Sequence, residues 1–248
     1  MKNMKKYITM NPYLVRNLSE LGFKKKNKHV FLKKHNDAII SLIFTHSSHF
    51  ERYAKYYTIT INISYIEIEK IKEISQYYNT GFGTNITYTI LSKSYDTIAA
   101  NRKFLEWRIA DDDTEKKTNI VINDMCRLLR EESIPIIEKY TKIKDVLFAY
   151  ENNTLPSAFF IDSITYPVLL YLSGDKQKAK TFIKDVFIFW NEQIKAGLVT
   201  KDAGTGFIHK DILTKYSGGR FIAPFRLEIY EEFAEKFREY IESKEKIQ

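Results

Sequence analysis

The sequence contains a single cysteine, Cys126, among 248 residues. An intrachain disulfide is therefore impossible, which excludes a small secreted scaffold held together by disulfides. Long apolar segments are also missing. The first 18 residues are basic but contain no apolar run of the length that export requires. The most apolar stretch, Ile161 to Leu172, contains Asp162 and Pro167 and is too short to span a membrane. We therefore expect a cytoplasmic protein with no membrane partner.

The amino-terminal segment almost lacks acidic residues. Residues 1–36 contain ten Lys and Arg side chains and one acidic side chain, Glu20. This segment carries a net charge of +9, whereas the whole chain carries +8, so the residues from Asp37 onward sum to −1. A charge placed so unevenly produces a field that attracts an acidic partner without requiring a close match of shape.

Motifs of common enzyme classes are absent as well. The sequence contains no Gly-x-Ser-x-Gly elbow and no kinase signature. The glycine pairs at residues 81–83 and 204–206 lack the spacing and the helical context of a phosphate-binding loop. We therefore expect no cofactor and favour a function without catalysis.

Hydrophobic patterning predicts an α+β fold in the first part of the chain. Apolar residues at helical spacing predict a helix from Asn11 or Pro12 to Leu21, with Gly22 as its C-cap. Strict alternation from Tyr57 to Tyr65 predicts a strand with one buried and one wet face. Shorter strands are predicted at 30–32, 38–45, 86–90 and 107–109. Together these segments predict an antiparallel sheet of about four or five strands with helices on one face.

From Thr118 onward the apolar period becomes helical and predicts a helical C-terminal region. Helices are predicted from 118 to a point near Pro135, then at 136–147, 156–172 and 175–196, and from Pro224 onward. The short polar segment 151–154 is the best candidate boundary. We predict an α+β domain at residues 1–150 and a helical region at residues 151–248, packed on or next to it.

Several short motifs carry a family resemblance. They are a helix ending in Leu21-Gly22-Phe23 with basic residues after it, a strand ending near Ser47–Ser48, the aromatic-rich strand with Thr60-Ile61-Asn62, and the segment with Trp107. In this order, over residues 10–150, they resemble the bacterial domain-of-unknown-function family 4304. The resemblance implies no established enzymatic activity. The occurrence of that family near bacterial toxin systems suggests an immunity-type or regulatory role.

The basic segment between the first helix and the next strands is the main candidate binding site. Its lysines are Lys24, Lys25, Lys26, Lys28, Lys33 and Lys34. Lysine is a flexible point charge, which suits contact with phosphates or with an acidic protein surface rather than bidentate reading of bases. The alternative interpretation is an edge hairpin that carries lysines only to prevent aggregation.

His46 and His49 are weak candidates for a metal site. Their spacing is i, i+3 at the end of a predicted strand, whereas the zinc-protease pattern needs i, i+4 on a helix with an acid between the histidines. Residues 111–113, three successive aspartates, lack the glycine and the spacing of a calcium loop and are interpreted as a turn that starts the next helix. Cys126 is interpreted as a buried structural thiol.

The sequence therefore favours a non-enzymatic module, of the immunity or antitoxin type, that binds an acidic protein partner such as a toxin through the basic hairpin. One alternative is a nucleic-acid-associated protein that uses the same hairpin with exposed aromatic side chains. A less favoured alternative is a metal-dependent hydrolase that uses the histidine pair.

Overall fold

The computed structural model describes residues 8–48, 53–75, 91–94, 106–152, 154, 161–162, 164–197, 221–222 and 227–245. The chain forms two compact units, which interleave in sequence. Unit 1 comprises residues 1–63 and 91–141, and unit 2 comprises residues 64–90 and 142–248. Each unit is described by itself. The division into domains at residue 150 stays a prediction.

Unit 1 contains the antiparallel sheet that the alternating patterns predict. Its main path runs in the order β1-β2-β3-β4-β5, and β6 pairs with β4 beside that path. The strands are β1 (Lys24–Lys25), β2 (Val30–His35), β3 (Ala38–Ser47), β4 (Ala54–Tyr65), β5 (Leu91–Ser94) and β6 (Trp107–Ala110). β1 with β2, β2 with β3, and β4 with both β5 and β6 pair antiparallel. The predicted α+β class with an antiparallel sheet is confirmed.

The strand β4 shows the predicted alternation from Tyr57 to Ile61. Tyr57, Ile59 and Ile61 are buried, whereas Thr58 and Thr60 are half-buried. Farther along the strand the alternation ends, because Asn62 and Ser64 on the predicted wet face are also buried. This end of β4 is therefore covered on both faces.

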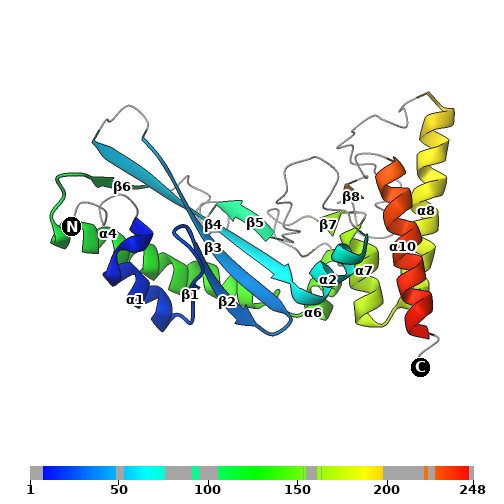
Figure 1. Cartoon of the computed structure of the whole chain (residues 1–248), viewed down its shortest axis with the longest axis horizontal. Helices are drawn as coiled ribbons and strands as arrows, with labels where there is room; N and C mark the ends of the chain where they lie inside the picture. Colours follow the sequence, from blue (N-terminus) through cyan, green and yellow to red (C-terminus); the bar gives the residue numbers. More distant parts are fainter. Residues whose placement is uncertain are drawn as a thin grey trace. The chain divides into compact units, whose positions relative to one another are not determined.

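Helices pack on one face of this sheet, as Figure 1 shows for α1 and α4. Unit 1 includes the 3-10 turn η2 (Ile8–Met10), α1 (Pro12–Glu20), α4 (Glu115–Leu128), a π-helical turn η4 (Leu129–Ser133) and α5 (Ile134–Glu138). α1 begins as predicted: the side chain of Asn11 accepts a hydrogen bond from the Tyr13 backbone N–H at 2.8 Å. It ends at Glu20 with Leu21 as its C-cap, and the next residue, Gly22, has a φ of 86° that favours glycine.

The prediction that a helix ends near Pro135 is wrong. The helical backbone continues from α4 through η4 into α5, and Pro135 lies in the first positions of α5. Proline has no backbone N–H to donate to the preceding turn. It is tolerated here because the wider π turn before it leaves no helical hydrogen bond that needs this donor.

Unit 2 contains the predicted helical C-terminal region. Its elements are α2 (Ile66–Ser75), α6 (Ile143–Glu151), β7 (Ile161–Asp162), α7 (Thr165–Ser173), α8 (Lys176–Lys195), β8 (Phe221–Ile222) and α10 (Leu227–Glu245). The helix predicted from Pro156 begins only at Thr165, because Ile161–Asp162 pairs with β8 as a short parallel strand. The predicted strand 86–90 and the glycine turns at 81–83 and 204–206 lie outside the described residues.

The last helix, α10, buries an apolar stripe within unit 2. Phe233, Phe237 and Ile241 have almost no exposed surface, and the ring of Tyr171 on α7 meets the ring of Phe237 edge to face. In the part of the chain that the structure describes, no helix has the length and apolar character needed to cross a bilayer.

Candidate functional site

The turn between β1 and β2 presents the basic segment, and local hydrogen bonds fix its shape. The side-chain oxygen of Asn27 accepts hydrogen bonds from the backbone N–H groups of His29 and Val30 at 2.8 and 3.0 Å. The backbone N–H of Lys26 donates to the carbonyl of Val30 at 2.8 Å. Asparagine favours such turns because its short side chain replaces a backbone acceptor. The lysines around the turn are therefore held on a defined backbone.

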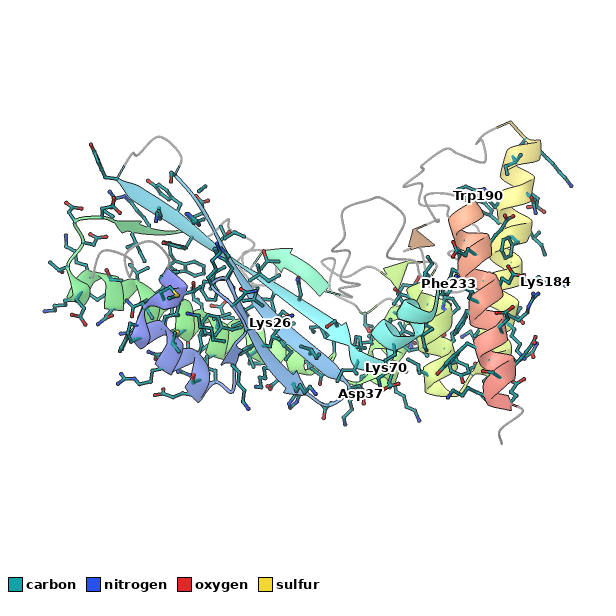
Figure 2. The ribbon with its side chains drawn as sticks, viewed as in Figure 1. Lys26, Asp37, Lys70, Lys184, Trp190 and Phe233 are labelled. Atoms are coloured by element: carbon teal, nitrogen blue, oxygen red, sulfur yellow. The ribbon has the colours of Figure 1, made fainter. Side chains whose placement is uncertain are left out.

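Three of the candidate lysines are exposed, and their side chains form no hydrogen bond or ion pair with the described residues. They are Lys24, Lys26 and Lys34. Lys24 lies opposite Leu32 in the β1–β2 register, and residues two apart on a strand share a face, so Lys24 and Lys34 lie on the same face of the sheet. Lys26 lies in the turn itself, where Figure 2 labels it. We call Lys24, Lys26 and Lys34 the basic surface.

The other three candidate lysines have different surroundings. The Lys25 ammonium donates to the carbonyl oxygen of Thr9 at 2.7 Å. Lys33 lies on the opposite face to Lys34, and its ammonium is 2.9 Å from a carboxylate oxygen of Glu138 on α5. Lys28 is exposed, and its backbone carbonyl accepts a hydrogen bond from the Thr9 hydroxyl. The charge of Lys33 is thus balanced locally, whereas the basic surface stays uncompensated.

The whole positive excess of the chain belongs to unit 1. Unit 1 contains 21 Lys and Arg against 13 Asp and Glu, whereas unit 2 contains 18 of each. The positive charge is therefore distributed unevenly between the two units, as it is along the sequence.

His46, one of the weak metal candidates, stacks on the ring of Tyr57, with 5.7 Å between the ring centroids. Partial burial lowers the pKa of His46, and its electrostatic interactions with Lys55 and His29 act in the same direction. His49 lies outside the described residues. The described ranges contain no group of three His, Cys, Asp or Glu side chains placed to hold a metal ion.

A cavity of about 380 Å³ lies where η2 and the first turns of α1 and α4 meet β4 and β6. Five elements or their flanking residues line it: Ile8, Asn11, Pro12, Tyr13, Lys55, Tyr57, Ile109, Ala110, Asp111, Asp113, Glu115 and Thr118. Its size suits one large side chain or a small ligand. The 3-10 turn η2 links the cavity to the basic turn, since Ile8 lines the cavity and Thr9 bonds both Lys25 and Lys28.

Tyr57 forms part of the cavity wall and is buried. Burial raises the pKa of its hydroxyl, the nearby Asp111 carboxylate raises it further, and a hydrogen bond with the Ile8 backbone acts in the opposite direction. The hydroxyl therefore stays protonated at neutral pH and offers an uncharged polar group.

Sequence reasoning missed this cavity, although one signal was available. Lys55 lies two residues before Tyr57, on the face of β4 that the alternation marks as buried. A lysine on a buried face needs space and solvent for its ammonium, so it points to a cavity at that edge of the sheet.

The three aspartates at 111–113 form a turn before α4, as the sequence predicts. A carboxylate oxygen of Asp113 accepts a hydrogen bond from the Ala110 backbone N–H at 2.7 Å, and Thr114 caps α4.

Cys126 is a buried free thiol. Burial raises its pKa from 9.0 to about 11, which makes it a poor nucleophile at neutral pH.

Comparison with protein families matches residues 14–139, just over half of the chain, to the model of DUF4304, a domain of unknown function. No curated protein and no solved structure matches the chain.

Proposed function

The chain belongs to the DUF4304 family, a domain of unknown function, and we propose that it is a non-enzymatic protein-binding module of the immunity or antitoxin type. It binds an acidic protein partner, such as a toxin, through the basic amino-terminal hairpin. The observation that carries this proposal is the basic surface: Lys24, Lys26 and Lys34 are exposed and lack carboxylate partners in the described residues.

Electrostatic steering explains why such a surface favours an acidic partner. Exposed charges that are not paired within their own chain contribute to the long-range field, whereas paired charges such as Lys33 largely cancel with their neighbour. The hairpin backbone is fixed by Asn27, so these lysines present a preformed charge pattern. Steering of this kind mainly raises the rate of association.

Affinity also needs buried apolar contact, and the cavity, which η2 links to the hairpin, supplies a place for it. Ile8, Tyr57 and Ile109 form an apolar part of its lining. A partner side chain inserted there would be desolvated while its surroundings meet the lysines. The acidic and basic residues at the edge of the cavity would then select the polar groups around that side chain.

The first experiment asks whether the product of a neighbouring reading frame forms a stoichiometric complex with the chain. With that partner, the triple variant Lys24→Glu, Lys26→Glu and Lys34→Glu is expected to slow association by about tenfold or more at low salt, because it reverses the steering charges. The control reverses the exposed residues Lys116, Lys139 and Lys144, which changes the net charge equally. Stopped-flow association rates at two ionic strengths provide the measurement.

Filling the cavity tests the apolar contact separately. Thr118→Trp is expected to speed dissociation, whereas Ile120→Trp on the exposed face of the same helix is not.

Equal association rates for the hairpin variant and its control would overturn the role of the basic surface. Tight binding of a generic labelled oligonucleotide, steeply weakened by salt, with no protein partner, would favour the nucleic-acid alternative instead.

A further inference from the structure

Two helices of unit 2 pack side by side and bury only one side of the pair. α8 and α10 run antiparallel, because Lys180 near the start of α8 meets Glu245 at the end of α10, whereas the ring of Phe187 packs on that of Tyr230 near the start of α10. The inner side of the pair is made of buried residues: Phe182, Val186 and Trp190 on α8, and Phe233 and Phe237 on α10. Figure 2 labels Trp190 and Phe233 on the two helices.

The outer side of the pair forms an open groove of about 630 Å³. Its lining follows the helical spacing on each helix: Lys180, Ile183, Lys184, Phe187, Ile188 and Asn191 on α8, and Glu231, Ala234, Glu235, Arg238, Ile241 and Glu242 on α10. Ile188 is 46% exposed, and Ile183 and Phe187 are half-buried. Water therefore contacts an apolar stripe that runs between two charged rims, which is a typical feature of an interaction surface.

The two rims carry opposite charge. The α8 rim is basic, with Lys180 and Lys184, and Figure 2 labels Lys184. The α10 rim is acidic, with three glutamates against the single Arg238. Lys184 and these glutamates form no ion pair within the described part of the chain. An occupant that satisfies both rims must therefore present an acidic helix over α8 and a basic helix over α10.

A second copy of this chain meets that requirement. We propose that the groove is a homodimer interface, in which the α8 and α10 pairs of two copies stack face to face about a two-fold axis parallel to the helices. This axis places α8 of one copy over α10 of the other, so the basic rim of each copy faces the acidic rim of its partner. The apolar stripes then meet in the centre of an antiparallel four-helix bundle.

The size of the surface is sufficient for such a dimer. Helices of 20 and 19 residues are about 30 Å long, and two adjacent helices are about 20 Å across. Their outer face therefore covers roughly 600 Å² per copy and roughly 1,200 Å² in the dimer, which is at the lower end of specific, stable interfaces. A dimer held by this area alone would exchange, with a dissociation constant on the order of micromolar.

The experiment uses the full chain and two charge variants in sedimentation equilibrium, from about 1 to about 100 µM. The α8 variant carries Lys180→Glu and Lys184→Glu, and the α10 variant carries Glu235→Lys and Glu242→Lys. Each variant alone is expected to weaken self-association at least tenfold, because like-charged rims meet. An equimolar mixture is expected to dimerise again, since the acidic α8 of one variant then faces the basic α10 of the other.

Single changes of exposed apolar residues complete the test. Ile188→Lys is expected to abolish the dimer, and Ile120→Lys, a change at an exposed position of α4, is expected to leave it unchanged. Circular dichroism confirms that each variant is folded. A wild-type chain that stays monomeric at every concentration, a dimer that survives both charge variants, or a mixture that fails to dimerise would each overturn the proposal.

Discussion

The thiol of Cys126 illustrates how burial sets the chemistry of one residue. Its side chain is almost completely buried on α4, and burial raises its pKa to about 11, although the Arg130 charge acts in the opposite direction. At pH 8 about one thiol in a thousand is ionised in the folded chain. We therefore expect very slow native labelling with iodoacetamide and rapid labelling in urea. Fast labelling of the folded protein would contradict the burial of Cys126.

The same shift predicts a pH dependence of stability. Between pH 9 and about pH 11 the unfolded chain releases the thiol proton while the folded chain retains it. The unfolded state is then favoured by ionisation, so the free energy of unfolding of the wild type falls over this range. Urea titrations at pH 8 and pH 10 are expected to show a larger loss for the wild type than for Cys126→Ala, which lacks the titrating group.

Gly22 determines how α1 ends and where β1 begins. Its φ of 86° is in the left-handed region, and a Cβ atom added at this position would meet Lys33 only at ordinary contact distance, 3.5 Å. The cost of Gly22→Ala therefore comes from backbone strain, about 1–2 kcal/mol of unfolding free energy. Gly22→Asn is expected to cost less, because asparagine tolerates this conformation better. Chemical denaturation of both variants tests this, and equal losses would contradict it.

Whole-chain organisation predicts how a fragment behaves. A fragment of residues 1–150 contains α2 and nearly all of α6. It lacks α7, against which both helices pack within unit 2, and α10, against which α2 packs. The buried side chains Ile68 and Ile71 of α2 would then lose their cover. We expect this fragment to aggregate or to bind a hydrophobic dye, in contrast to the full chain. A monomeric fragment that unfolds cooperatively would instead support the domain boundary predicted after residue 150.

The largest features of this chain follow from local sequence patterns. The 3.6-residue period identified α1, α8 and α10, and the two-residue period identified β4, because burying one face of an element requires that spacing. The caps at Asn11, Gly22 and Asp175 are equally local, since each satisfies or redirects backbone groups next to it in sequence. The concentration of positive charge in residues 1–36 is likewise a property of the sequence alone.

Tertiary structure determined which side chains of these elements lie close together. The six candidate lysines lie within residues 24–34, but they do not share one face of the sheet. Strand register places Lys24 and Lys34 on one face and Lys33 on the other, where it pairs with Glu138. The cavity and the α8–α10 groove each combine residues that are far apart in the chain. Local periodicity shows which face of an element is buried, but only long-range pairing determines which side chains meet there.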